Sequence, residues 1–577
     1  MILQALTQLY EDLVSRGEIS RPGWSKAKIS YALCLGEDGS LIQVIPQFAQ
    51  EQVGKKTVLR PQKMELPAAV TRTVGVVPNF LWDNSSYLLG TDEKGKPERS
   101  LECFRACTRL HHVLLDKVDS VAAKAVLAYF DSWQPEQASQ HPALADCWED
   151  LMKGANLIFR VNGGFAQEDP LIQAAWNEYY CRSEGKKTQC LVTGRQDVPE
   201  SVHPTIKGVA GAQSSGAAIV SFNAPAFCSY GKEQSLNAPV GKYAAFAYTA
   251  ALNHLLADRE NVQRIGETTV VCWAEGAEPA YQKYAFAAIF GGQLPEQITT
   301  DTLRSTVKRL ADGLPCRELQ LDPSRAFYIL GLSPNAARLS VRFFYRSTFG
   351  EVMKNVNAHH TRMKIVGSLY EWIPLWAMLR ETVNLNTTDK SPGPAMAGAT
   401  ARAIFSDTAY PASLLEAVML RIRAERDITP GRAAILKAYY LKNPNSQCPE
   451  EVLHVSLNEN STNIPYTLGR LFAVYEAVQE RANPGINATI KDKYFNSAAS
   501  TPATIFPILD NLCQKHLRKL DTGLRIYFDK QITQLKNILG ETNPLRLTLP
   551  EQGSFNLGYY HQKQSIYTKR LTIKSQA

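Results

Sequence analysis

The spacing of apolar residues changes partway along the chain, and this change restricts the fold more than any other feature. Before about Phe349, segments that alternate like strands lie among segments of helical periodicity, without the regular alternation of a doubly wound sheet. Beyond about Leu375, apolar residues recur only at helical spacing. The sequence therefore predicts an α+β fold, in which an irregular mixed α/β N-terminal region is followed by an all-α helical bundle.

This pattern divides the chain into three expected segments. A mixed α/β region over 1–375 is followed by a linker-like segment over 376–400, rich in Thr, Gly, Pro and Ala, and by a helical bundle over 401–577. Runs of apolar and β-branched residues predict strands in the first segment, at 30–35, 41–45, 268–273, 326–330 and 340–345. The first two are expected to form a hairpin.

The composition is that of a globular protein and excludes several other classes. Of the 577 residues, 45% are hydrophobic and 20% are charged, which excludes a collagen, a mucin-like stalk and a disordered chain. The 11 cysteines have no repeated short spacing, and the first residues lack the pattern of a signal peptide, so we expect free thiols and a cytoplasmic protein. The longest uncharged run, 208–231, is too polar to cross a membrane.

One short stretch has cysteines and histidines at helical spacing. Cys103, Cys107 and His111 are four residues apart, which places them on one helix face, and His112 follows directly. Zinc needs four tetrahedral donors, and a single helix rarely supplies them all. We therefore expect an ordinary helix here, and the sequence predicts no metal and no other cofactor.

Positive charge is concentrated in the last third of the chain. The net charge is +8, and residues 410–577, with 21 Lys or Arg against 14 Asp or Glu, carry +7 of it. Two interpretations remain open: a helical domain that is merely basic and solvated, or a surface that follows a phosphate backbone and releases its counterions.

A second basic stretch lies near the N-terminus and leads into the residues 78–84. Cations next to planar side chains and amides suit contacts to phosphates and then to base edges, although most such runs are solvated loops. The cations of this stretch are Lys55, Lys56, Arg60, Lys63 and Arg72.

The stretch 203–237 is rich in glycine, amides and serine. It is not a P-loop, because two alanines follow Gly216 where Lys and Ser or Thr are required. Three interpretations remain open: a ligand-binding loop, an amidase-like serine hydrolase site at Ser214-Ser215 with a lysine base, and a buried hairpin whose amides cap backbone groups. In the binding interpretation a strand at 218–222 positions the contact residues, which are Lys207, Gln213, Ser214, Ser215, Asn223, Lys232, Gln234 and Asn237.

Six strings spread over nearly the whole chain are more specific than any generic motif. They are PNFLWDN at 78–84, SSGAAIVSFNAPAFCSYGKEQSLNAPV at 214–240, SPNAAR at 333–338, YTLGRLFAVYEAVQ at 466–479, NATIKDKYF at 487–495 and EQGSFNLGYYHQ at 551–562. Together they resemble the large subunit of the type I-C CRISPR surveillance complex, known as Cascade.

The resemblance implies a non-catalytic DNA-binding subunit of an RNA-guided antiviral complex. Such a subunit recognises the short protospacer-adjacent motif (PAM) of duplex DNA, aids duplex opening and helps to recruit a separate helicase–nuclease. The implied partners are the CRISPR RNA, target double-stranded DNA with its displaced single strand, and the backbone, 5′-handle and small subunits of Cascade. The C-terminal bundle resembles that small subunit, which in this subtype is thought to be made from an internal start in the same gene.

The resemblance also suggests roles for particular residues. Asn79 and the loops around Gln213 and Asn237 are expected near PAM base edges, so that Asn79→Ala would relax PAM discrimination. Phe80 or Trp82 would supply a wedge where the strands part, unless their rings are core residues. Phosphate contacts are expected from the basic stretch before residue 78 and, along the displaced strand, from Arg470, Lys491, Lys493, Lys515, Arg518 and Lys519.

Overall fold

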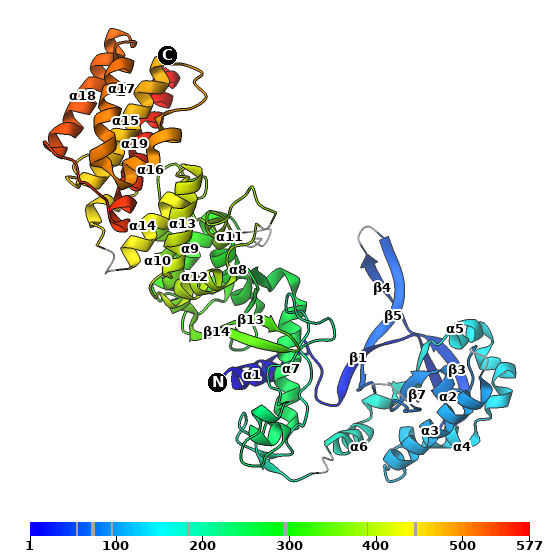
Figure 1. Cartoon of the computed structure of the whole chain (residues 1–577). Helices are drawn as coiled ribbons and strands as arrows, with labels where there is room; N and C mark the ends of the chain where they lie inside the picture. The colour runs from blue at the N-terminus through cyan, green and yellow to red at the C-terminus, as the bar shows by residue number, and fades with distance from the viewer. Residues whose placement is uncertain are drawn as a thin grey trace. The chain divides into compact units, whose positions relative to one another are not determined.

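The structure is a computed structural model, and it describes residues 1–53, 56–70, 75–93, 96–181, 185–222, 224–291, 298–388, 390–443 and 447–576. The chain forms two compact units: the first comprises 3–204 and 222–251, and the second comprises 205–221 and 252 onward. The chain passes from the first unit to the second for the last time within helix α7 (Lys242–Ala257). A mixed α/β N-terminal region and a helical C-terminal half are present, which confirms the predicted fold class (Figure 1).

The first unit is built around a five-stranded sheet. Its strands are, in spatial order, β3 (Leu41–Pro46), β2 (Tyr31–Leu35), β7 (Asn156–Val161) and β6 (Trp82–Asn84), with β8 (Gly164–Phe165) also paired to β7. The antiparallel pair β2–β3 confirms the predicted hairpin, whereas β2 and β7 run parallel. An apolar core joins this sheet to helices α3 (Pro97–Leu115), α4 (Val121–Ser132) and α6 (Pro170–Cys181).

A second, three-stranded sheet of the first unit has the order β1–β5–β4. Its strands are β1 (Trp24–Ile29), β5 (Lys56–Pro67) and β4 (Phe48–Val53), all antiparallel to their neighbours. Figure 1 shows β4, and the half of β5 that pairs with it, extending away from the helices that cover the five-stranded sheet. The remaining α-helices and strands described in this unit are α1 (Ile2–Ser15), α2 (Ser85–Leu88), α5 (Trp148–Met152), β9 (Thr188–Gln189) and β10 (Gln196–Asp197).

The second unit begins with an antiparallel four-stranded sheet and continues in helices. The strands are β11 (Gln263–Ile265), β12 (Thr268–Ala274), β13 (Ala326–Asn335) and β14 (Arg338–Thr348), in that spatial order, and they confirm the strands predicted at 268–273, 326–330 and 340–345. Helices of the same unit are α8 (Pro279–Phe290), α9 (Thr300–Ala311), α10 (Phe349–Met363), α11 (Leu375–Arg380), α12 (Pro394–Ser406), α13 (Ala412–Glu425) and α14 (Pro430–Lys442). The expected linker segment 376–400 thus contains most of α11 and the first half of α12.

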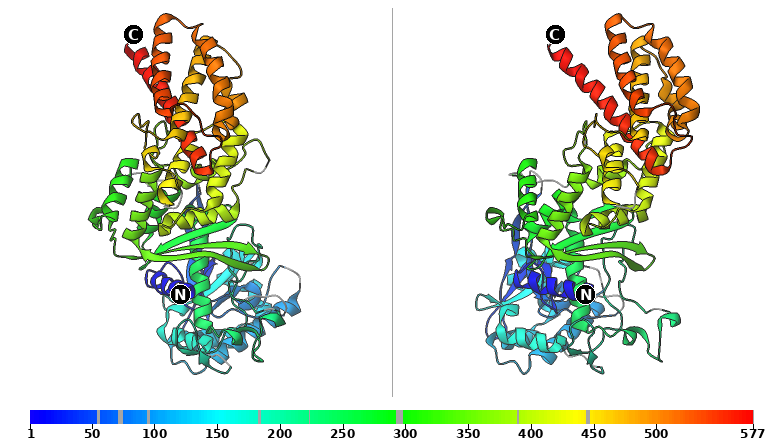
Figure 2. Two further views of the ribbon diagram at one scale, coloured as in Figure 1. Left: turned by 60° about the vertical axis from the view of Figure 1, so that its left-hand side comes forward. Right: turned by 90° about the vertical axis from the view of Figure 1, so that its left-hand side faces the viewer.

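The C-terminal bundle of the second unit consists of α15 (Ile464–Ala482), α16 (Ile490–Ser500), α17 (Pro502–Leu517), α18 (Thr522–Leu539) and α19 (Leu549–Gln576). Figure 2 shows these helices, in orange and red, gathered side by side. Helices α15 and α19 cross at glycines, since a Cβ at Gly469 would collide with the carbonyl oxygen of Phe555 and one at Gly558 with that of Tyr466. Such a close backbone approach requires residues without a side chain.

One apolar core runs through the whole second unit. It includes strand residues such as Ile265 and Phe327 together with bundle residues such as Phe472 and Tyr560. In the part of the chain that the structure describes, no helix combines the length and the apolar character that crossing a bilayer requires.

Candidate nucleic-acid interface

The segment 78–84, which was predicted to read bases, is largely buried in the first unit. Asn79 is only 5% exposed. Its side-chain Oδ1 accepts a hydrogen bond from the Val70 N–H at 2.9 Å, and its own backbone N–H donates to Asp83 Oδ2 at 2.9 Å. This geometry corrects the expectation of a base contact, because the Asn79 side chain holds a neighbouring loop and is not presented on the surface.

The two aromatic residues of this segment are also core residues. Phe80 is 1% exposed and stacks on Trp176 with 5.2 Å between ring centroids. Trp82 is 5% exposed and its indole N–H donates to the Pro67 carbonyl at 2.8 Å. The expectation that Phe80 or Trp82 forms a wedge is therefore corrected: their rings stabilise the unit from inside, which was the alternative considered for both.

Between these rings, Leu81 and His111 form a constrained pair. Leu81 has a positive φ of 65°, and its N–H donates to His111 Nε2 at 2.9 Å. Nε2 is therefore the unprotonated nitrogen, and Nδ1 donates to the Cys107 carbonyl at 2.8 Å. Burial lowers the pKa of His111 to about 4, so the ring is neutral at physiological pH. Among the described residues no group of three or more His, Cys, Asp or Glu side chains could hold a metal ion.

The N-terminal basic stretch is carried by the three-stranded sheet. Lys63 on β5 lies directly opposite Lys28 on β1, and both side chains are exposed. Like charges in directly opposite positions repel each other, and a bound anion would relieve this repulsion. Arg60 is exposed on the same strand, and the backbone of Lys56 pairs with Val53. Two further residues of the predicted stretch, Lys55 and Arg72, lie outside the described residues.

The glycine-rich stretch 203–237 is divided between the two units. Lys207, Gln213, Ser214 and Ser215 belong to the second unit, and their side chains are exposed. The loop that carries them is held by hydrogen bonds between Ile206 and Ala217 and by a bridge from Ala218 to Arg338.

Two expectations for this stretch change with the structure. A single bridge, from Ala218 to Arg338, is present in place of the strand expected at 218–222. Within the described part of this loop, no lysine amine forms a hydrogen bond with the hydroxyl of Ser214 or Ser215, so a nucleophile–base pair is not assembled there.

In the first unit, Asn237 organises a surface loop. Its Oδ1 accepts from the Ser229 N–H at 2.8 Å, and its Nδ2 donates to the carbonyls of Lys232 at 3.1 Å and Gln234 at 2.9 Å. The amide of Asn237 is therefore occupied by its own loop, which corrects the prediction that it reads a base. Lys232 and Gln234 are exposed. Asn223, which was predicted to act with them, lies outside the described residues.

The same loop presents an aromatic side chain that the sequence analysis missed. Tyr230 is 98% exposed and adopts a positive φ of 54°, and Gln234 has a φ of 43°. Non-glycine residues in this region are strained, and such strain is concentrated at functional sites. An almost fully exposed aromatic ring, two residues before the exposed Lys232, is suited to stack on a nucleic-acid base. The sequence Tyr-Gly-Lys at 230–232 is typical of a turn with positive φ angles, but it does not show that the Tyr230 side chain is exposed.

Two of the six predicted cations of the bundle, Arg470 and Lys491, are not exposed and are held by other residues of the second unit. Arg470 is 7% exposed, and it donates to Gln562 Oε1 at 3.1 Å and to the Glu459 carbonyl at 3.3 Å. Lys491 forms an ion pair with Asp427 at 3.2 Å. These contacts correct the expectation that Arg470 follows a DNA strand. The ion pair of Lys491 links α16 to the loop between α13 and α14.

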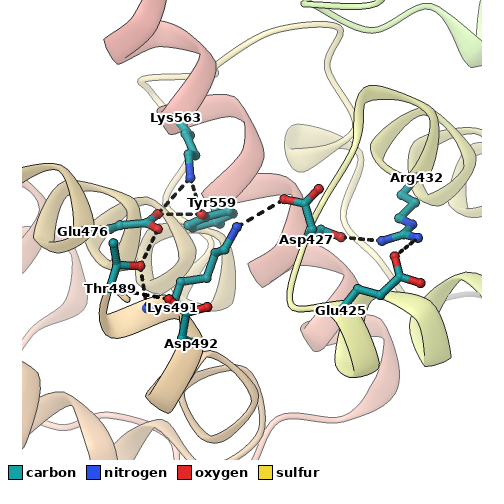
Figure 3. A network of polar contacts seen from close by, with 9 residues as sticks. All are labelled: Glu425, Asp427, Arg432, Glu476, Thr489, Lys491, Asp492, Tyr559 and Lys563. Carbon is teal, nitrogen blue, oxygen red and sulfur yellow. Dashed lines mark hydrogen bonds and ion pairs between the residues drawn. The ribbon is translucent and has the colours of Figure 1, made fainter. Parts of the chain in front are cut away.

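Figure 3 shows the polar network around Lys491. The Glu476 carboxylate is buried and accepts from Tyr559 Oη at 2.6 Å, Lys563 Nζ at 3.1 Å and Thr489 Oγ1 at 3.0 Å. On the other side of Lys491, the Asp427 carbonyl accepts from Arg432 at 2.9 Å. Removing one partner of such a buried pair leaves an uncompensated charge, so the network fixes how α14, α15, α16 and α19 pack.

The other four predicted cations of the bundle are exposed. Lys493 lies 5.1 Å from the centroid of the Tyr494 ring. Lys515 is in the last turn of α17, and Arg518 and Lys519 follow it, with Lys519 Nζ donating to Asn483 Oδ1 at 3.1 Å. Cations at a helix C-terminus are stabilised by the helix dipole, so this position alone does not require a ligand.

The comparison with known protein families gives an identity for the chain. Residues 6–567 match the family described as CRISPR-associated protein (Cas_Csd1). Because the match covers nearly the whole chain, the protein belongs to this family of CRISPR-associated proteins. No curated protein matches the sequence. Membership supports a role in CRISPR antiviral defence and, with it, in a CRISPR effector complex.

Proposed function

We propose that this protein is the large subunit of a type I-C Cascade complex and that it recognises the PAM of target duplex DNA without cutting it. The observation that carries the proposal is the loop 228–237, in which Asn237 holds the backbone and Tyr230 stands almost fully exposed. Family membership supports the CRISPR context, and the loop supports a direct contact with DNA.

In this proposal the lysine pair of the three-stranded sheet positions the DNA. Lys28 and Lys63 face each other across β1 and β5, and a phosphate between them would remove their mutual repulsion. Phosphate contacts fix the register of a protein on a duplex but carry no sequence information. Sequence would be read by the exposed amide of Gln234, in the same unit.

Duplex opening requires only modest protein contacts. Exchange of a DNA duplex for a guide–target heteroduplex is nearly balanced in free energy, and stacking of one base on an aromatic side chain contributes about 1–3 kcal/mol. Tyr230 can supply that contact where Phe80 and Trp82 cannot, since both of those rings are buried. Pairing of target and guide RNA would then proceed, with the displaced strand held by the exposed cations of the bundle.

The proposed partners follow from the same assignment. They are the CRISPR RNA, the target duplex and its displaced strand, the other Cascade subunits in the cytoplasm and a helicase–nuclease recruited in trans. The chain itself would break no bond. Covalent labelling of Ser214 or Ser215 by a serine-directed probe would contradict this.

The test uses the assembled complex and a library of duplexes that differ in the bases flanking one target. We expect Tyr230→Ala to weaken opening of the preferred duplexes by about 1–3 kcal/mol. The matched control is Tyr179→Ala, which removes another exposed tyrosine of the same unit. We expect Lys63→Gln to reduce the slope of log affinity against log salt by about 0.9, uniformly across sequences. A complex that lacks this chain and still discriminates flanking bases would contradict the proposal.

A further inference from the structure

A cavity of about 300 Å³ lies in the second unit, where helix α12 packs on β11 and β14 (Figure 1). The turn between β11 and β12 closes one side of it, since a Cβ at Gly266 would stand 2.9 Å from Pro394 Cα at the start of α12. Two arginines, Arg342 of β14 and Arg402 of α12, line the cavity together with one carboxylate, that of Glu267. The cations exceed the carboxylate by one charge, so the cavity favours an anion.

A β-bulge sets the position of Arg342. Gly331 pairs with Phe343 and Leu332 pairs with Val341, so Arg342 is the extra residue of β14. A bulge bends its strand and re-aims the side chain that it carries. Arg342 Nε donates to the buried Ser333 Oγ at 2.6 Å, which holds the guanidinium group in place. Among the residues that the structure describes, its two terminal nitrogens have no partner, and they can donate to a ligand in the cavity.

Arg402 approaches the same space from α12. Pro394, Gly398 and Arg402 recur at intervals of four residues, so they lie on one face of the helix, and all three line the cavity. In the described part of the chain the Arg402 guanidinium forms no hydrogen bond and no ion pair. The helix begins at Pro394 without a side-chain cap, so the positive end of its dipole adds to the charge of the two arginines.

Thr268 contributes a buried hydroxyl to the cavity. This residue of β12 is 2% exposed and lines the cavity. Its Oγ1 lies 3.6 Å from the position that a Cβ would take at Gly398, so the hydroxyl faces α12. Within the described residues this hydroxyl forms no hydrogen bond. Buried polar groups are normally paired, so a hydroxyl without a partner indicates that a ligand completes the site.

We propose that this cavity, here called the arginine cavity and defined by Glu267, Thr268, Arg342 and Arg402, binds a phosphate group of a nucleic-acid strand. Donors reach it from three elements: β12, β14 and α12. A tetrahedral phosphate has oxygens for all three directions, whereas a carboxylate offers only two oxygens in one plane. Arginine also suits phosphate because its planar fork can form two parallel hydrogen bonds. The inference deepens the proposed function and depends on it for the nucleic acid that carries the phosphate.

The carboxylate of Glu267 gives the proposal a prediction of opposite sign. It lines the same cavity and would repel a bound phosphate. Within the described residues it forms no ion pair with either arginine, so its neutralisation breaks no existing contact with them. Glu267→Gln should therefore tighten phosphate binding, whereas loss of an arginine should weaken it.

The first test measures thermal unfolding of the full chain in phosphate and in chloride at equal ionic strength and pH 7. We expect phosphate to raise the melting temperature of the wild type and of the control Arg380→Gln, which removes an exposed arginine of α11 in the same unit. The increase should be absent in Arg402→Gln, reduced in Arg402→Lys, which keeps the charge without the planar fork, and larger in Glu267→Gln. No increase in the wild type, or an equal increase in all variants, would overturn the proposal.

The second test separates free phosphate from a nucleic-acid strand. The affinities of the full chain for single-stranded DNA and RNA oligonucleotides are measured over a range of salt concentrations. We expect Arg402→Gln to reduce the slope of log affinity against log salt by about 0.7 for at least one of the two, the contribution of one phosphate contact, while Arg380→Gln keeps the wild-type slope. Loss of the phosphate effect with both slopes unchanged would overturn the assignment to nucleic acid and leave PAM recognition standing.

Failure of the proposed function is seen separately in the assembled complex. A phosphate contact carries no sequence information, so a complex that contains Arg402→Gln should still discriminate flanking bases. Loss of that discrimination in this variant, but not in Arg380→Gln, would overturn the assignment of the arginine cavity to phosphate alone. A wild-type complex that ignored flanking bases would instead contradict PAM recognition, whatever the phosphate response of Arg402→Gln.

Discussion

Acid should open the core of the first unit through a single histidine. His111 accepts the Leu81 N–H and has a folded-state pKa of about 4, against about 6.5 when exposed. The unfolded state therefore binds the proton more tightly, and the stability contributed by the neutral ring is complete above pH 6.5 and lost as the pH falls towards 4. At pH 5 the loss of stability amounts to about 2 kcal/mol, which corresponds to an about 30-fold lower protection of the amide against hydrogen exchange.

The assay is amide hydrogen exchange of a peptide that contains Leu81, corrected for the pH dependence of the intrinsic rate. His111→Gln should be less stable at pH 7 but should show little further loss between pH 7 and 5. The neighbouring His112 is the control: hydrogen bonding to Asp116 raises its pKa, so its proton favours the folded state at low pH. His112→Gln should therefore keep the acid sensitivity. The reasoning is refuted if His111→Gln and the wild type lose equal protection on acidification.

Three further changes have defined outcomes. Gly469→Ala should destabilise the bundle by about 1–3 kcal/mol in thermal unfolding, because its Cβ meets the Phe555 carbonyl, whereas Gly523→Ala, with no contact closer than 3.4 Å, should not. Asn79→Ala should cost about 1–3 kcal/mol of stability in denaturant unfolding, because the Val70 N–H loses its acceptor, and flank discrimination by the folded complex should stay the same. Lys63→Glu should slow hydrogen exchange in β5, since an opposite charge then faces Lys28, and should weaken duplex binding.

The fold class was predictable because periodicity reports burial directly. The hairpin β2–β3 and the strands β12, β13 and β14 have the alternation or continuous apolar character that a sheet requires, and the helices after residue 400 have a period that only helices share. The close crossing of α15 and α19 was not predicted, since a glycine within a helix shows that room is needed but not which carbonyl occupies it.

Individual contact residues were less predictable, because the same types of side chain bind ligands on a surface and stabilise the fold in a core. Asn79 and Phe80 have the chemistry of a base contact, yet tertiary packing buries both. Tyr230 was passed over because the exposure of one loop aromatic leaves no periodic signal.

The continuous core of the second unit limits where a separate C-terminal protein could start. Met419 is the last methionine of the chain and lies in the middle of α13, where its sulfur accepts from Asn556 Nδ2 at 3.5 Å. A ribosome that initiated there would omit α10 and half of α13, so the product would emerge with the flank of α14 that packs on α10 facing water. Such a product would need to begin upstream, or to be covered during synthesis by another protein.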